Sequence, residues 1–122
     1  MPLTAADLSG KRRQKYGAKP VTVDNIRFAS TKEAKRYGEL KLLEKAGEIA
    51  DLQLQCPFPL AVWQMDFSAD LEEIGEYVAD FTYHDIQKNE RVVEDVKGFK
   101  TPLYRWKKKH VEAQYGIEIR EV

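Results

Sequence analysis

Two carboxylates and one amine stand among apolar residues in the second half of the chain. Asp80 lies in Tyr77-Val-Ala-Asp-Phe, and Asp95 and Lys97 lie in Val92-Val-Glu-Asp-Val-Lys-Gly. Runs of β-branched and aromatic residues of this kind predict short strands. Because side chains alternate along a strand, Asp95 and Lys97 share one face and Val96 points to the other. Placing such charges on a half-buried strand costs desolvation free energy. A metal ion and a water molecule between these groups would offset that cost.

The chemistry that this spacing favours is metal binding. Asp80 and Asp95 fall on neighbouring strands of a predicted hairpin, where facing side chains come within a few ångströms. Two carboxylates at such a short distance repel each other unless a cation lies between them. Mg²⁺ accepts one or two protein carboxylates and keeps several waters. A lysine beside the ion, here Lys97, can orient or help to deprotonate an attacking water.

Local signals predict the elements that must position these residues. Asp24-Asn25 is a turn-prone pair that favours a hairpin over residues 21–28. Ser30 or Thr31 can cap a first helix, and Thr101-Pro102 can begin a second one. The expected elements after the hairpin are a helix over 31–46, strands over 49–55, 58–63, 76–84 and 91–97, a helix over 102–115 and a strand over 117–122. The acidic stretch 65–75 is expected to be a loop, and the sequence assigns it no role.

Glu33 falls on the apolar stripe of the first predicted helix, which Ala34, Tyr37 and Leu40 define. A carboxylate in the first turn of a helix complements the helix dipole and the free amide groups there. A carboxylate that points inward can also serve a metal site. The residues alone leave both interpretations of Glu33 open.

Composition limits the class of protein. The chain has 122 residues with 43% hydrophobic and 33% charged content, which favours one soluble globular domain. The longest apolar runs fall well short of the roughly 20 residues of a membrane span, and no signal-peptide core is present. We therefore expect no membrane association and a cytoplasmic location. Cys56 is the only cysteine, which excludes an internal disulfide. Residues 1–18 are polar and basic, which predicts a flexible arm.

The net charge is formally zero, but the charges are segregated along the chain. Basic residues gather near the N-terminus and again after Lys97, and segregation of this kind can give a neutral molecule a basic face. Such residues would contact DNA phosphates and add affinity without sequence preference. The candidates are Lys15, Lys19, Lys100, Arg105, Lys107 and Lys108.

An Asp followed further along by Asp-x-Lys resembles the signature of the PD-(D/E)XK nucleases. The predicted order of helix, three or four strands, helix and strand also resembles the α-β-β-β-α-β common core of restriction-endonuclease-like proteins. Longer segments resemble a family of small nucleases of phages and prophages, catalogued mostly as a domain of unknown function. These segments are Lys15–Phe28, Ser30–Tyr37, Leu40–Ile49, Tyr77–Phe81, Val93–Gly98 and Thr101–Tyr104.

The resemblance implies an α/β fold, with residues 19–122 forming a single restriction-endonuclease-like domain whose mixed central sheet is flanked by helices. It implies that Glu33, Asp80, Asp95 and the Val96 carbonyl hold Mg²⁺, with Mn²⁺ as a substitute, and that Lys97 is the catalytic lysine. The implied activity is a Mg²⁺-dependent DNA endonuclease that is structure-selective, like Holliday junction resolvases. It would act as a homodimer on branched DNA during phage recombination or replication, in the bacterial host cytoplasm.

Two other functions stay open from the sequence. The chain could be a non-catalytic DNA-binding or assembly module that retains the nuclease fold, or a nuclease subunit of a larger transposase or packaging complex. Among residues near the site, Glu94 is expected to face away from Asp95 and to serve as a structural ion-pair partner. Trp106 and His110 are expected to pack on the inner side of the second helix.

Overall fold

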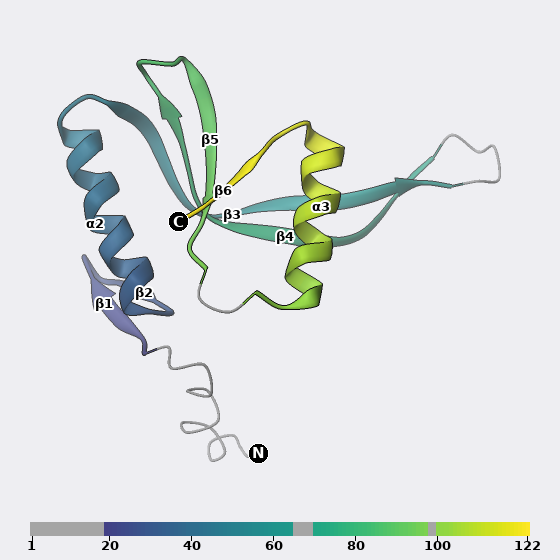
Figure 1. The fold of residues 1–122 in the computed structure, drawn as a ribbon, viewed down its shortest axis with the longest axis horizontal. Coiled ribbons are helices and arrows are strands. Elements are labelled where there is room, and N and C mark those ends of the chain that lie inside the picture. The colour runs from purple at the N-terminus through teal and green to yellow at the C-terminus, as the bar shows by residue number, and fades with distance from the viewer. Residues whose placement is uncertain (1–18, 65–69, 98–99) are drawn as a thin grey trace, which may run out of the picture. The chain divides into compact units, whose positions relative to one another are not determined.

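The computed structural model describes residues 19–64, 70–97 and 100–122 (Figure 1). The chain packs as two compact units, Met1–Leu42 and Leu43–Val122, and each is described by itself. The fold is mixed α/β, and after an initial hairpin the elements are a helix, three strands, a helix and a strand, which is the shorter of the two predicted orders. They are β1 (Val21–Val23), β2 (Ile26–Phe28), α2 (Thr31–Lys45), β3 (Ile49–Trp63), β4 (Leu71–Asp85), β5 (Glu90–Asp95), α3 (Pro102–Tyr115) and β6 (Ile119–Glu121).

The predicted hairpin at the start of the first unit is confirmed. β1 and β2 pair antiparallel, and the two turn residues, Asp24 and Asn25, have φ values of 54° and 63°. Asn and Asp tolerate this left-handed region better than other residues with a side chain. The hairpin packs on the start of α2 through the Phe28 and Tyr37 rings, whose centroids are 5.0 Å apart.

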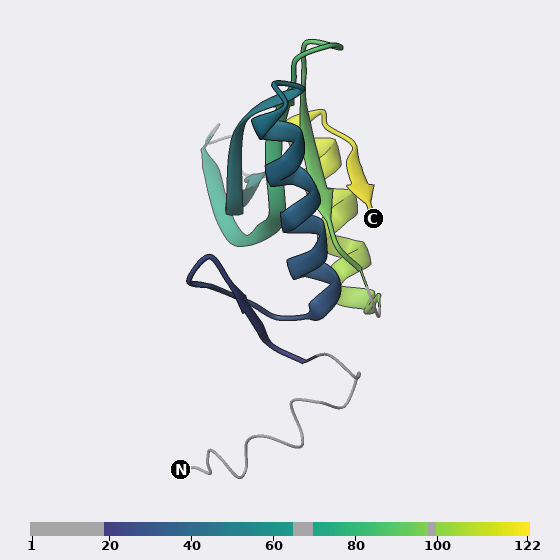
Figure 2. The same ribbon diagram turned by 90° about the vertical axis from the view of Figure 1, so that its left-hand side faces the viewer.

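The helix α2 begins and ends where local signals predict, and it runs without interruption (Figure 2). Ser30 Oγ accepts a hydrogen bond of 3.1 Å from the Glu33 amide, which caps the first turn. Gly47, at φ +80°, lets the chain leave the helix, and its amide donates to the Glu44 carbonyl. The predicted apolar stripe is buried at Ala34, Tyr37 and Leu40.

The second unit contains a four-stranded mixed sheet in the order β3-β4-β5-β6. The first two pairings are antiparallel, and β5 pairs parallel with β6. A parallel neighbour needs a crossover connection, which α3 provides between β5 and β6. The mixed sheet predicted from the sequence is therefore confirmed.

The prediction of two separate strands over 49–63 was wrong, because β3 is continuous through Cys56-Pro57. Among the described strands, β3 pairs with β4 alone, so it lies at an edge of the sheet. A proline has no backbone N–H to donate, and on the open side of an edge strand this breaks no hydrogen bond. Asp51 and Gln55 have φ values of 57° and 52°, and the β3–β4 register shifts between Ala50 and Gln53. The strand thus bends locally and does not end.

The opposite strand is also longer than predicted. β4 starts at Leu71, so the second half of the supposed 65–75 loop is strand, and residues 65–69 lie outside the described residues. β3 and β4 together form a long two-stranded ribbon that continues past α3 (Figure 1).

The helix α3 is confirmed at both ends. Thr101 Oγ1 accepts from the Tyr104 amide, Pro102 begins the helix, and Gly116 ends it with φ 65°. Val111 is fully buried on the sheet side of α3. The core that α3 closes consists of Leu60, Tyr77, Ala79, Val93, Val111 and Ile119.

Trp106 does not belong to this core, which corrects the sequence prediction. Its side chain is 52% exposed, and its ring lies against His110 at a centroid distance of 5.6 Å. The rotation of α3 about its axis is set by Val111 and Tyr104, which places Trp106 on the opposite side of the helix. His110 is half-buried, with Nε2 3.1 Å from the Ala61 carbonyl oxygen.

In the part of the chain that the structure describes, no helix has the length and apolar content needed to cross a membrane.

Candidate active site

The sheet register brings the two predicted metal-binding carboxylates face to face. Phe81 on β4 pairs with Glu94 on β5, and Asp80 and Asp95 are the next residues of the two strands beyond this pair. Facing residues of antiparallel strands have side chains on the same side and within contact distance. The Asp80 carboxyl accordingly hydrogen-bonds the Asp95 carboxyl.

Asp95 is almost fully buried, at 2% exposure. The Tyr77 hydroxyl donates a hydrogen bond to Asp95 Oδ2. Burial, followed by the hydrogen bond with Asp80, raises the pKa of Asp95 to about 7, although Tyr77 and Lys97 oppose the rise. Near neutral pH and without a cation, Asp95 is therefore partly protonated beside Asp80.

Asp80 is fixed by the backbone at the end of β5. Its Oδ2 accepts a hydrogen bond of 2.8 Å from the Val96 amide. Beyond that point the chain is tied to β6, because the Lys97 amide donates to the Val122 carbonyl and the Val122 amide donates to the Asp95 carbonyl. These bonds hold Lys97 in place even though β5 ends at Asp95, two residues earlier than the predicted strand.

Lys97 lies beside Asp95, as the predicted alternation required. Its Nζ is 3.4 Å from Asp95 Oδ2, and 3.9 Å from the centre of the Tyr104 ring. A cation over an aromatic face is attracted by the ring quadrupole. The ammonium group is therefore held between a carboxylate and an aromatic ring.

Tyr104 is in turn anchored to β6. Its hydroxyl donates a hydrogen bond of 2.7 Å to Glu121 Oε2, and burial raises the pKa of this hydroxyl, so it stays protonated. Glu121 also pairs with Lys100 at 2.8 Å and Lys108 at 3.5 Å. The hydrogen bonds from Lys100 and Tyr104 lower the pKa of Glu121 to about 2.

A surface pocket of about 360 Å³ opens beside these groups. Asp95, Lys97, Tyr77, Tyr104 and Lys107 are among its lining residues, together with Thr101 and Leu103 at the start of α3. The buried carboxylate and the lysine thus border a space that a ligand can enter. Pockets in which polar groups converge are the usual location of binding and catalytic sites.

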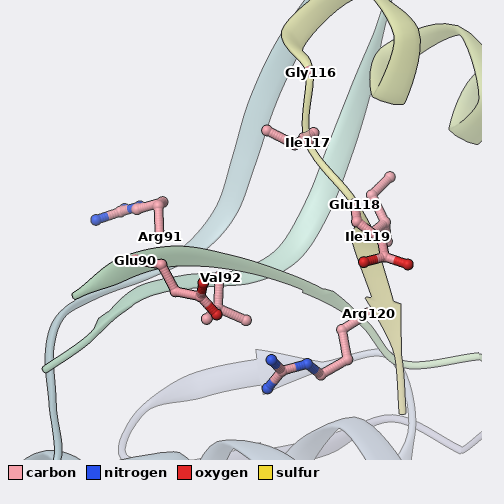
Figure 3. Close-up of a pocket in the computed structure, with 8 residues that line it drawn as sticks. All are labelled: Glu90, Arg91, Val92, Gly116, Ile117, Glu118, Ile119 and Arg120. Carbon is pink, nitrogen blue, oxygen red and sulfur yellow. The ribbon is translucent and has the colours of Figure 1, made fainter. Parts of the chain in front are cut away.

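A second cavity, of about 430 Å³, lies between β5 and the segment that leads from α3 into β6 (Figure 3). Glu90, Arg91 and Arg120 line it, and none of the predicted catalytic or metal-binding residues does. Arg91 is engaged by Asp51 at 2.8 Å and by Thr82 at 2.8 Å. We therefore place the candidate active site at the first pocket.

Glu94 has the structural role predicted for it. Its side chain is fully buried and accepts a hydrogen bond from the Tyr83 hydroxyl. Arg120 Nη1 lies 4.0 Å from Glu94 Oε2. Glu94 pairs with Phe81, and Asp95 points to the other side of β5, so these neighbouring acids serve different purposes.

Glu33 belongs to the first unit and helps to cap α2 there. Its Oε1 accepts a hydrogen bond of 3.1 Å from the Ala29 amide, and its own amide donates to Ser30. This reciprocal pattern is close to a capping box. The capping role is thus observed, and a role of Glu33 in a metal site stays a prediction.

The groups at the pocket fit a hard divalent cation. No set of three or more His, Cys, Asp or Glu side chains within the described ranges is gathered closely enough to hold a metal ion. Mg²⁺ does not require one, because it binds through one or two carboxylates and keeps several waters. Asp80 and Asp95 supply two such carboxylates, and their shared hydrogen bond is the contact that a cation would replace.

The structure separates the predicted DNA-binding residues into groups. Lys107 lines the pocket and Arg105 is exposed on α3, while Lys100 and Lys108 are paired with Glu121. Lys19 is exposed in the first unit, and Lys15 lies outside the described residues.

Three site residues were missed by the sequence reasoning. Tyr77 and Tyr104 stand among apolar neighbours, and aromatic residues in such positions are more often core residues. Both rings do pack in or against the core, and their hydroxyl groups act as donors at its edge. No local signal marks Glu121, whose partners come from distant segments.

A family model described as "Protein of unknown function (DUF1064)" matches residues 13–121, so the chain belongs to this family. No curated protein and no solved structure matches the chain.

Proposed function

We propose that this member of the DUF1064 family is a divalent-metal-dependent DNA endonuclease that selects branched DNA and works as a homodimer. The observation that carries the proposal is the pair of facing carboxyl groups, Asp80 and Asp95, with the Lys97 ammonium 3.4 Å from Asp95. A structural ion pair requires one acidic and one basic side chain, whereas this site has two carboxyl groups beside one ammonium group. Two adjacent acids, one of which is still partly protonated near neutral pH, form an arrangement that a bound cation would stabilise.

Asp80 and Asp95 would hold Mg²⁺ or Mn²⁺ at this edge of the sheet, with the Val96 carbonyl as a further ligand. When bound, the ion supplies a Lewis acid for the phosphoryl oxygen and lowers the pKa of a coordinated water. Tyr77 holds Asp95, and the Val96 amide holds Asp80, so both carboxylates are preorganised. Lys97 faces the pocket and orients the attacking water toward the phosphorus.

The lysines around the pocket would bind the DNA backbone. Lys107 lines the pocket, and Lys100 and Lys108 stand near it through their pairing with Glu121. Contacts of this kind position DNA without reading its sequence.

The proposal is tested by incubating the purified full-length protein with four-way junction, flap, nicked and linear DNA, with and without Mg²⁺. We expect Mg²⁺-dependent cleavage of one or more branched substrates in preference to linear DNA. Metal-independent binding without cleavage of any substrate would instead indicate a non-catalytic binding or assembly module. Cleavage that needs an added partner protein would indicate a subunit of a larger complex.

Removing one metal-binding carboxylate should abolish this activity. We expect Asp80→Ala to lower the cleavage rate by at least about 100-fold, the order of effect seen when preorganised charge stabilisation is removed. Glu118→Gln is the matched control, because Glu118 is exposed and lies at the other cavity. If Asp80→Ala cleaves as fast as the parent protein, Asp80 is not part of the site.

Tyr104 should act as a positioning residue for Lys97. We expect Tyr104→Leu to lower kcat by roughly 2- to 30-fold, because a cation–π contact contributes about 0.5–2 kcal/mol. KM for DNA should change little. Tyr104→Phe keeps the ring and should restore most of the rate, although it loses the hydrogen bond to Glu121. Equal losses in the Phe and Leu variants would show that the ring does not hold Lys97.

A further inference from the structure

The far end of the β3–β4 ribbon carries large apolar side chains on its surface. Trp63 and Leu71 face each other across the two strands and are 62% and 60% exposed. Glu73 shares their face because side chains two positions apart along a strand point the same way. Figure 1 shows that the β3–β4 ribbon crosses α3 and projects sideways past this helix. We call Trp63, Leu71 and Glu73 the ribbon patch.

The outward side of α3 carries a second exposed apolar stripe. Leu103 and Trp106 are 62% and 52% exposed, and the exposed Ala113 lies two turns after Trp106 on the same side of the helix. The buried residue Val111 lies on the other side of the helix. A helix that contacts only its own sheet would place polar residues on the outward side. Exposed apolar stripes of this kind mark interaction surfaces.

The charges of the two surfaces are complementary. The ribbon strands contain no Lys or Arg over residues 51–64 and 70–85, and acidic residues border the patch. The helix α3 carries Arg105, Lys107, Lys108 and Lys109, with Glu112 as its only acid. Lys109 is exposed and flanks the apolar stripe. An acidic apolar surface and a basic apolar surface on one chain favour a second copy of this chain as the partner.

We propose that two copies associate through the ribbon patch of each and the α3 stripe of the other. A two-fold axis allows both contacts to form at once, and the assembly closes as a dimer. Trp63 and Trp106 are the aromatic anchors of the interface, a role for which tryptophan is strongly enriched. This inference gives a location to the homodimer of the proposed function, but its evidence does not depend on catalysis.

The experiment measures self-association of the full-length chain by sedimentation velocity, without DNA or metal. The parent protein should form a concentration-dependent dimer. Glu73→Lys and Lys109→Glu should each weaken it by about tenfold or more, because each places like charges across the interface. A mixture of the two variants should regain a dimer, since each reversed residue then meets a partner of opposite charge.

Glu118→Lys is the control, because it makes the same charge change away from both surfaces, and it should leave the dimer unchanged. Trp63→Ser and Trp106→Ser should also give monomers, and circular dichroism will show whether these surface variants stay folded. A parent protein that is monomeric at all concentrations would overturn the proposal. A dimer that resists both charge reversals, or one lost on deleting residues 1–18 but unaffected by the reversals, would also overturn it. Self-association is measured without DNA, so a failure of the dimer proposal can be told apart from a failure of the nuclease proposal.

Discussion

Replacing Lys97 by alanine is expected to lower the rate of DNA cleavage by about 10²–10⁴-fold, the range of a positioned acid–base group. DNA binding should weaken only slightly, because Lys97 is one of several cations near the pocket. Its Nζ is 3.4 Å from Asp95 Oδ2, so its position is set by the same carboxylate that would hold the metal. The loss should therefore appear in kcat and leave the affinity for DNA nearly unchanged.

Measurement requires single-turnover cleavage of a four-way junction together with a binding titration in Ca²⁺ or without metal. Lys88→Ala is the matched control, because Lys88 is exposed in the turn between β4 and β5. Lys97→Arg tests whether charge alone is enough, since the wider guanidinium does not reproduce an ammonium point charge. A Lys97→Ala protein that cleaves at the parent rate would remove Lys97 from the mechanism.

Asp95→Asn is expected to abolish cleavage and, in the absence of metal, to stabilise the protein at high pH. The folded-state pKa of Asp95 is raised to about 7 from its usual value of 3.8, chiefly by burial. The folded protein therefore holds a proton that the unfolded chain has released, and stability falls as pH rises from about 4 to about 7. Asparagine stays neutral throughout this range and escapes the penalty.

The melting temperature of Asp95→Asn should therefore exceed that of the parent by an increasing amount between pH 4 and 7, and by a constant amount above pH 7. The plateau should reach several degrees, because 1 kcal/mol corresponds to roughly 4–8 °C in a small domain. Adding Mg²⁺ at pH 8 should raise the melting temperature of the parent but not of the variant. Asp51→Asn is the control, because the pKa of this exposed carboxyl is lowered by Arg91. If the melting temperature of the parent protein changes with neither pH nor Mg²⁺, the assignment of a metal to Asp95 is contradicted.

Local sequence signals predicted correctly those structural features that depend on residues close together in the sequence. The ends of α3 follow from Thr101, Pro102 and Gly116, and the pairing of Asp80 with Asp95 follows from a hairpin with a short turn. The continuity of β3 through Cys56-Pro57 was not predicted. A proline predicts the end of a strand unless that strand is known to lie at the edge of the sheet. Edge position is a property of the whole sheet.

The parts of the site that escaped prediction depend on tertiary packing. Tyr77 and Asp95 are 18 residues apart in the sequence and come together only in the folded sheet, and the sequence alone predicts the Tyr77 ring as a core residue. Trp106 was placed on the wrong side of α3, since the sequence does not reveal which side of that helix faces the sheet. The burial of Val111 shows which side of α3 faces the sheet.

The position of Glu121 has a consequence for how DNA affinity depends on salt. Its carboxylate, whose pKa is lowered to about 2, stays ionised at working pH and partly neutralises Lys100 and Lys108 before any DNA arrives. The release of counterions from DNA scales with the number of phosphates that a protein neutralises. Three side chains that together carry one positive charge will displace fewer counterions than two unpaired lysines. Binding should accordingly tolerate rising salt better than the count of lysines near the pocket suggests, and Glu121→Gln should make that dependence steeper.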